Sequence, residues 1–256
     1  MLSSKQNNED NMQAVFANIT DRISELLDVR PGVIAIVGGG GKTTLMYCLA
    51  DELKRRGKVI VTTTTHIYCP THIPVLTGAT RERVKEALAA DSILCVVEPG
   101  RLDKMQPPAM PIAELAALAD YCIVEADGAR HLPLKAPAPH EPAMPGEANL
   151  VIAVAGLDGV GKRMNETVFR PERFAAIVGK SPEAAVTPDD CAMVLQHCAG
   201  LRKSVPKEAR FCVILNKADT AERIIYGEQI AEAMESDLAD RVLITSLCER
   251  PVFHRI

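Results

Sequence analysis

The chain has 256 residues, 47% of them hydrophobic and 24% charged, with a formal net charge of −4 and no tryptophan. This composition is typical of a globular chain with an aliphatic core, and the scattered lysines and arginines exclude a basic surface for nucleic acid. No apolar run approaches the roughly 20 residues of a membrane-spanning helix and the N-terminus lacks a signal-peptide core, so we expect a cytoplasmic protein with neither nucleic acid nor membrane as its partner.

Residues 1–30 are predicted to be an N-terminal extension. Apolar residues recur with helical spacing over about 10–27, which predicts a helix that packs on the sheet or on a partner. Residues 31–256 are predicted to form one α/β domain that contains a helical lid or subdomain at about 165–205.

A phosphate-binding loop is predicted between a buried strand at 33–37 and a helix that continues to Arg56. Without side chains, the loop glycines allow backbone N–H groups to approach phosphate oxygens, and the helix N-terminus adds favourable partial charge. Lys42 would then reach the β and γ phosphates, and the Thr43 hydroxyl would bind Mg²⁺. The residues predicted to hold the nucleotide here are Gly38, Gly39, Gly40, Gly41, Lys42, Thr43 and Thr44.

The spacing of this loop departs from the usual G-x-x-x-x-G-K-[ST]. That pattern requires glycine at position 36, where the chain has Ile36. The tighter G-x-x-G-K-T-T fits instead, a form associated with Mur-type ligases and some ATP-driven partitioning proteins. A glycine-rich turn that binds nothing is the alternative.

A second strand, predicted at 58–62, runs into four consecutive threonines. Ligands bind at the carboxyl ends of parallel strands in open α/β sheets, so Thr64 and Thr65 are candidates to hold Mg²⁺, its water ligands or a substrate. β-propensity alone explains the first two threonines.

The loop that follows contains Cys69, with His66 and His72 nearby. A metal or chalcogen site is one interpretation, but these residues lack a recognised ligand spacing, and we prefer a loop cysteine with solvated histidines. The chain has eight cysteines and no Cys-x-x-Cys, so we interpret most of them as reduced core residues.

The next predicted elements are a helix at 80–90, a strand at 93–97 and a helix at about 112–119. An apolar strand then begins at Tyr121, carries Glu125 and Asp127 at its end and stops at Gly128. This is the form of a Walker-B or switch segment, in which a carboxylate orients the Mg²⁺ shell. Either acid can be the magnesium carboxylate and share catalysis with Lys42. A strand that ends in an acidic turn is the alternative.

A proline-rich segment then carries Arg130 and Lys135. Irregular segments of this length are often functional, so both residues are candidates to bind phosphate or an anionic second substrate. Solvated surface charge is an equally good interpretation.

A strand at 149–155 leads into a second formal G-x-x-x-x-G-K at 156–162, but Arg163 stands where a hydroxyl is required, which indicates a loop. Helices at 171–178 and 188–199 would form the lid.

The strand at 211–216 runs into Asn-Lys-x-Asp, the guanine-recognition pattern of GTPases. Asp219 would accept hydrogen bonds from guanine N1 and the 2-amino group, Lys217 would pack over the base, and Asn216 would brace the loop. A carboxylate cannot pair in this way with adenine, so the motif favours GTP. A helix at about 221–235 and a strand at 241–245 complete the alternation, and Ser246 falls where GTPases place their last base-contacting loop.

In its motifs and their order, the chain resembles the YqeC family of selenium-dependent hydroxylase accessory or selenium cofactor biosynthesis proteins. The motifs are GGGGKTT, TTTTHIY, EADGAR, LPLKAPAPHEP, GLDGVGK, RPE and NKAD. The resemblance covers roughly residues 31–245. It implies a P-loop NTPase that assists the maturation of selenium-containing molybdenum hydroxylases.

These patterns together predict a three-layer α/β fold of the P-loop type, with a mainly parallel sheet and a small helical insertion. The predicted function is Mg²⁺-dependent binding and hydrolysis of a purine nucleotide, GTP in preference to ATP. Two alternatives are an ATP-dependent small-molecule kinase or ligase, with the acceptor at Arg130, Lys135 and the 156–170 loop, and a nucleotide sensor without catalysis.

Overall fold

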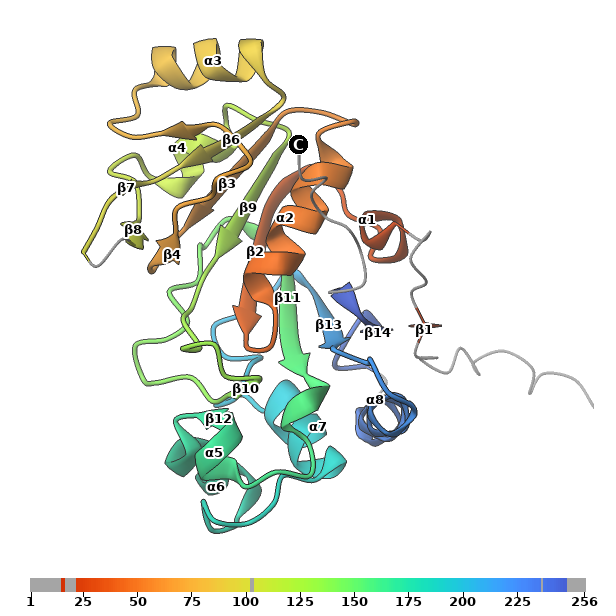
Figure 1. Ribbon diagram of the computed structural model, residues 1–256. Helices are drawn as coiled ribbons and strands as arrows, with labels where there is room; N and C mark the ends of the chain where they lie inside the picture. Colours follow the sequence, from red (N-terminus) through yellow and green to blue (C-terminus); the bar gives the residue numbers. More distant parts are fainter. Residues whose placement is uncertain (1–14, 17–21, 102–103, 236, 248–256) are drawn as a thin grey trace, which may run out of the picture.

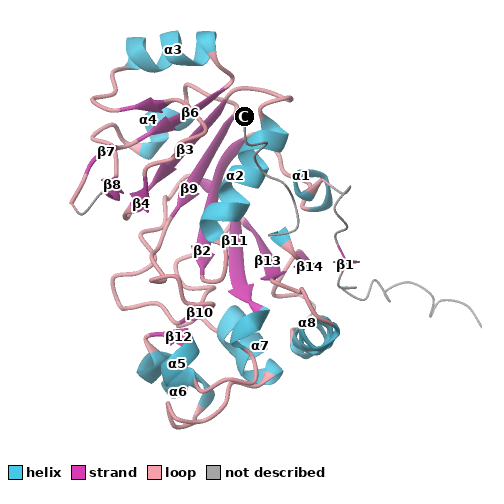
Figure 2. Ribbon diagram, in the orientation of Figure 1, coloured by secondary structure: helices cyan, strands magenta, loops and turns pink. Residues whose placement is uncertain are grey.

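The computed structural model describes residues 15–16, 22–101, 104–235 and 237–247 (Figure 1). Over these ranges strands and helices alternate and build three layers, with a central sheet and helices on both of its faces (Figure 2). The predicted fold class is confirmed. No helix in the described ranges has the length and apolar character needed to cross a membrane.

The central sheet has nine strands among the described residues, in the order β1-β14-β13-β11-β2-β9-β3-β6-β5, and every neighbouring pair is parallel. Because β2 lies between β11 and β9, the glycine loop and the acidic segment emerge side by side at the carboxyl edge. The strands are β1 Val15–Phe16, β2 Gly32–Gly38, β3 Val59–Thr63, β5 Val75–Leu76, β6 Ile93–Val96, β9 Tyr121–Glu125, β11 Ala148–Gly156, β13 Arg210–Asn216 and β14 Arg241–Thr245.

The sheet is buried on both faces, as its apolar strands predict. Along β2, Val33, Ala35 and Val37 pack into one hydrophobic cluster, while Ile34 and Ile36 pack into the other. Helices α1 Ile23–Leu26 and α2 Lys42–Leu53 cover the second face. The first face is covered by α3 Arg81–Ala90, α4 Ile112–Ala116, α7 Pro188–Gln196 and α8 Ala221–Ala233.

Helix ends follow the chemistry of the sequence. Thr80, Thr187 and Thr220 each accept a hydrogen bond from a backbone N–H in the first turn of α3, α7 and α8, and Asp190 completes a capping box on α7. Helix α6, Pro171–Val178, ends at Gly179 in the left-handed conformation. The predicted bounds of α6 and the predicted caps of α3 and α7 are therefore confirmed.

The N-terminal segment differs from its prediction. Residues 15–16 form β1, which pairs with β14 where a helix over 10–27 was expected, and α1 covers only Ile23–Leu26. Residues 1–14 and 17–21 lie outside the described residues. The helical spacing is misleading at β1 because the edge strand β14 offers unpaired backbone groups, and pairing with them outweighs a local preference.

The helical insertion lies at the carboxyl edge of the sheet and consists of α5 Met164–Thr167, α6 and α7 (Figure 1). We call α5, α6 and α7 the helical subdomain. A two-stranded parallel sheet, β10 Leu134–Lys135 with β12 Val168–Phe169, joins it to the proline-rich segment. A small antiparallel sheet of β4 Ile67–Tyr68, β8 Lys104–Gln106 and β7 Glu98–Pro99, together with the short helix η1 Leu157–Gly159, was not predicted.

Candidate functional site

The glycine loop connects β2 to α2 and needs its glycines for two reasons. Gly38, Gly40 and Gly41 have φ of 99°, 77° and 130°, where other residues are strained. In addition, a Cβ on Gly38 would overlap the Val154 carbonyl oxygen, and one on Gly41 would overlap the Asn216 amide. The loop is therefore held tightly between β11 and the end of β13.

The backbone N–H groups of the loop are already partly used. Gly38 donates to the Asp127 carboxylate, Gly39 to the Val154 carbonyl and Gly40 to the Leu132 carbonyl. The first N–H groups of a helix have no partner within it, so those at the start of α2 are the ones available to a phosphate. This moves the expected anion contacts from the first glycines to Gly41, Lys42, Thr43 and Thr44.

Glu125 contacts the start of α2. The Thr43 hydroxyl donates to Glu125 Oε2 at 2.8 Å, which brings a hydroxyl and a carboxylate together at the mouth of the loop. Burial raises the pKa of the Glu125 carboxyl, and the Lys42 ammonium and the Thr43 hydroxyl oppose this shift. A hydroxyl, a carboxylate and phosphate oxygens form a ligand set that suits Mg²⁺, so these residues fit the metal expected from the sequence.

Asp127 occupies a different environment from Glu125. Its carboxylate accepts the Gly38 N–H at 3.1 Å and forms ion pairs with Lys42 at 3.2 Å and Lys135 at 3.0 Å. Lys42 Nζ also donates to the Gly38 carbonyl at 2.6 Å and lies 3.9 Å from Glu125. Asp127 is fully buried and does not line the cavity described below, so its geometry is that of a support for the loop.

A chain of ion pairs runs from the glycine loop to the helical subdomain. Lys135 pairs with Glu141 at 2.8 Å, and Glu141 accepts two hydrogen bonds from Arg170, at 2.6 and 2.8 Å. Burial alone would raise the pKa of Glu141, but the hydrogen bonds from Lys135 and Arg170 outweigh it and lower the pKa to about 2. We call Lys42, Asp127, Lys135, Glu141 and Arg170 the ion-pair chain.

Asn216 braces the loop as expected, although it lies far away in the sequence. Its amide donates to the Gly40 carbonyl at 2.8 Å, and its oxygen accepts the Leu247 N–H at 3.1 Å. Lys217 has a φ of 66° and pairs with Asp158 at 2.8 Å. Asp219 accepts from Arg223 at 3.0 Å and from the Ser246 hydroxyl, so Ser246 lies beside it.

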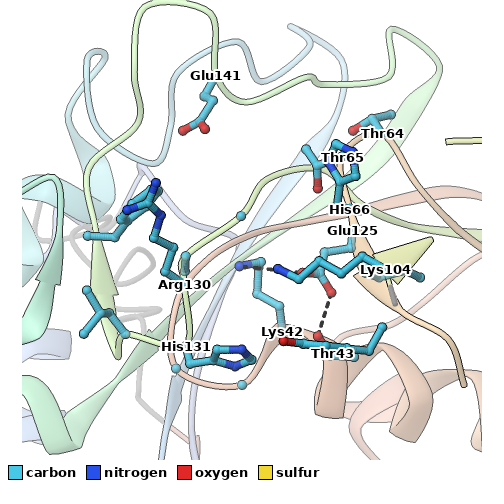
Figure 3. A pocket seen from close by; sticks show the side chains of 18 of the residues that line it. Lys42, Thr43, Thr64, Thr65, His66, Lys104, Glu125, Arg130, His131 and Glu141 are labelled. Atoms are coloured by element: carbon cyan, nitrogen blue, oxygen red, sulfur yellow. Dashed lines mark hydrogen bonds and ion pairs between the residues drawn. The ribbon is translucent and has the colours of Figure 1, made fainter. Parts of the chain in front are cut away.

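A cavity of about 700 Å³ opens in front of the glycine loop (Figure 3). One wall consists of the loop end and the start of α2, with Lys217 beside them; the other walls come from the segments after β3 and β9 and from β8 and β12. Its lining residues are Gly40, Gly41, Lys42, Thr43, Thr44, Thr64, Thr65, His66, Ile67, Tyr68, Lys104, Glu125, Gly128, Ala129, Arg130, His131, Leu132, His140, Glu141, Ala143, Phe169 and Lys217.

The predicted substrate residues separate into two groups. Thr64, Thr65 and Arg130 line the cavity, whereas Lys135 is buried beneath it with a side-chain exposure of 0%. The two carboxylates that hold Lys135 also keep it away from a second substrate. Asn216 and Asp219 do not line the cavity either, although Lys217 between them does.

Sequence reasoning did not single out several residues of the site, although Phe169 and Arg170 lie in the 156–170 loop that it considered for an acceptor. His131, Tyr68, Lys104 and Phe169 line the cavity, and Glu141 and Arg170 complete the ion-pair chain. The long irregular segment after β9 was a signal for His131 and Glu141. Lys104 and Tyr68 had no comparable signal, because they face each other only through the pairing of β4 with β8, which are distant in the sequence.

Two comparisons with known proteins identify the family. Residues 34–172 match the model of a family described as "YqeC protein". A protein of Escherichia coli strain K12, described as "Uncharacterized protein YqeC", is 32% identical over 234 residues, which are 88% of this chain and 91% of that protein. The chain belongs to the YqeC family. The resemblance inferred from the motifs is thereby confirmed.

The segment that matches the YqeC model begins in β2 and ends in α6. It therefore contains the glycine loop, Glu125 and the whole ion-pair chain as far as Arg170. The strand β13, which carries Asn216, lies beyond this segment. The family model thus covers the glycine-loop side of the site and its connection to the helical subdomain.

Proposed function

We propose that this protein binds a purine nucleoside triphosphate with Mg²⁺ at the glycine loop and hydrolyses the phosphoanhydride bond of its terminal phosphate, which releases the diphosphate and inorganic phosphate. The observation that carries the proposal is the contact of Thr43 with Glu125 at the start of α2, beside Lys42. A hydroxyl, a carboxylate and a lysine at a glycine-rich strand-to-helix turn are the groups that phosphoryl transfer requires.

Each group has a distinct role in this proposal. The N–H groups at the start of α2 bind the phosphate oxygens, and Thr43 and Glu125 hold Mg²⁺, which when bound neutralises charge between phosphates. Lys42 leaves Asp127 and turns to the phosphates, while Asp127 keeps its bond to Gly38. With positioning and charge neutralisation alone, we expect slow intrinsic turnover.

Guanine is the base that we propose in preference to adenine. The Asn-Lys-x-Asp segment supports this choice, since Asn216 contacts the Gly40 carbonyl and Asp219 lies beside Ser246. Binding of guanine to Asp219 would replace its hydrogen bonds from Arg223 and Ser246.

For the biological role, we propose an accessory function in the maturation of selenium-dependent molybdenum hydroxylases. The resemblance of the motifs to the YqeC family supports this role. The protein partner would then be such a hydroxylase or its cofactor machinery.

The proposed function is tested by calorimetric titration of Mg-GTP and Mg-ATP, combined with a phosphate-release assay. We expect wild type to bind GTP more tightly than ATP, and Asp219→Asn to lose that preference. Lys42→Ala should lower the affinity for both nucleotides by about tenfold or more, since a charged hydrogen-bonding partner is lost. Asp237→Asn, at an exposed aspartate, is the matched control.

The outcomes separate the alternatives. Equal ATP binding that is insensitive to Asp219 would contradict guanine recognition and favour an ATP-dependent kinase or ligase. Tight binding without phosphate release would indicate a sensor. Binding of neither nucleotide would refute the proposal as a whole.

A further inference from the structure

We propose that the cavity contains a second subsite, which binds a small molecule through a phosphate or carboxylate group while the nucleotide occupies the glycine loop. This subsite lies around Arg130 and Lys104 and rests on the proposed function. It would make the protein a two-substrate or ligand-stimulated enzyme rather than a simple NTPase.

The first reason is the volume of the cavity. A volume of about 700 Å³ lies in the range of pockets that enclose a whole small-molecule ligand. Asn216 and Asp219, at the proposed base site, lie outside this cavity. Lys217 is the one residue of the Asn-Lys-x-Asp motif that lines the cavity. The nucleotide would therefore place its phosphates in the cavity and its base at and beyond Lys217, which leaves the part lined by Arg130 and Lys104 for another molecule.

The second reason is uncompensated positive charge. Lys42 and Lys217 line the cavity but are paired with Asp127 and Asp158. Arg130 and Lys104 also line it, and neither forms an ion pair within the part of the chain that the structure describes. In Figure 3 the Lys104 side chain extends towards Lys42, whereas the Arg130 side chain lies on the opposite wall and extends away from Lys42. An anion is the ligand that would neutralise them.

The acidic side chains of the cavity do not offset this charge. Glu125 accepts the Thr43 hydroxyl and lies near Lys42, and Glu141 is held by Lys135 and Arg170. Both carboxylates thus have cationic partners of their own. Within the described ranges, no carboxylate offsets the positive charge of Arg130 and Lys104, which is the charge that the proposed ligand would meet.

Aromatic rings position the two cations. The Arg130 guanidinium lies 5.2 Å from the centroid of the Phe169 ring, and Lys104 Nζ lies 5.1 Å from that of Tyr68. Tyr68 in turn stacks on His131 at a centroid distance of 5.8 Å. Cation–π contacts orient a cation but leave its charge and its hydrogen-bond donors free, so the subsite is ordered before the ligand arrives.

The backbone of the same wall is strained. Arg130 and His131 are consecutive and have φ of 49° and 62°, a conformation that residues other than glycine rarely adopt. Such strain concentrates at ligand sites, where the surrounding structure maintains it. Thr64, on an adjacent wall, has a buried hydroxyl with no hydrogen-bond partner among the described residues. A bound anion would accept from this hydroxyl.

The experiment fills the glycine loop first. Protein saturated with Mg-GMPPNP, or with Mg-AMPPNP if only adenine nucleotides bind, is titrated calorimetrically with inorganic phosphate and, separately, with succinate. We expect one of the two probes to bind once per chain, and its affinity to fall about tenfold or more in Arg130→Gln and in Lys104→Gln. Lys85→Gln, an exposed lysine on α3, should bind as wild type does.

Variants that retain nucleotide binding are shown to be folded, which separates a lost subsite from a lost fold. Phosphate binding alone indicates a phosphorylated ligand, and succinate binding alone indicates a carboxylate. The subsite is refuted if neither probe binds the nucleotide-saturated protein, or if both substitutions leave binding unchanged. If no nucleotide binds, the proposed function fails, and titration of the free protein and the same variants still decides whether an anion binds at Arg130.

Discussion

At the scale of single residues, two carboxylates that are two positions apart in the sequence have different contacts. Glu125 faces Thr43 and the cavity, whereas Asp127 is enclosed by the Gly38 N–H, Lys42 and Lys135. The raised pKa of Glu125 follows first from burial, because removal from water disfavours the charged form. This carboxylate is the one whose protonation would compete with Mg²⁺.

Glu125→Gln should therefore weaken the Mg²⁺ dependence of nucleotide binding and remove its pH dependence. If Glu125 holds Mg²⁺ as proposed, a proton would compete with the metal as the pH falls through the raised pKa of Glu125, so metal affinity should begin to decline at a higher pH than for an ordinary glutamate. The glutamine cannot titrate. Titrations of nucleotide at fixed Mg²⁺ between about pH 5 and 8 measure the effect. Parallel pH profiles for wild type and variant would show that Glu125 does not hold the metal.

At the scale of elements, the ion-pair chain joins parts of the fold that also share one hydrophobic cluster. It links the segment after β9, the strand β10 and the start of α6, where Arg170 is left-handed with a φ of 67°. Because Lys135 is fully buried, removal of one partner leaves an uncompensated charge, which is strongly destabilising. The chain therefore ties the helical subdomain to the glycine loop.

Glu141→Gln should lower the free energy of unfolding at pH 7 by on the order of 2 kcal/mol. The pKa of Glu141 is lowered from 4.5 to about 2, so its stabilisation is present above pH 4.5 and is lost as the pH falls towards 2. Denaturant unfolding at several pH values should show that the difference in free energy of unfolding between wild type and Glu141→Gln becomes smaller below about pH 4.5. Glu147→Gln, an exposed glutamate of the same segment, is the control; an equal loss in both variants would contradict a specific role for Glu141.

At the scale of the whole molecule, the site depends on the complete sheet. The glycine loop follows β2, Glu125 ends β9, Asn216 ends β13, and the cavity is closed by β8 and β12. A ligand that contacts segments spread over the chain binds the folded state and not the unfolded one. Its binding should therefore stabilise the entire domain.

Saturation with Mg-nucleotide at about 100 times the dissociation constant should add about 2.7 kcal/mol of stability, which corresponds to a rise in Tm of roughly 5 to 10 °C. Thermal unfolding of wild type with and without Mg-GTP measures this shift. Lys42→Ala should show a much smaller shift at the same nucleotide concentration. A shift of equal size in that variant would place the nucleotide elsewhere than at the glycine loop.

Much of this architecture follows from local sequence. The buried strand before Gly38, the amphipathic helix after Lys42 and the threonine caps are set by side-chain chemistry over a few residues, and the alternation of strands and helices predicts a parallel sheet. It also follows that the glycine loop, Glu125 and the threonines lie close together, because parallel strands end at one edge of the sheet. The sequence by itself therefore determined the fold class and the set of candidate residues around the loop.

Only the tertiary structure decided how these residues are used. Glu125 and Asp127 look alike in sequence, and Lys135 looks like a surface lysine, but burial against Gly38 and Glu141 gives Asp127 and Lys135 supporting positions. The contact of Asn216 with Gly40 spans 176 residues. Strand order, burial and charge pairing depend on which distant segments meet, and no local spacing encodes that choice, because its free energy comes from contacts that exist only in the assembled fold.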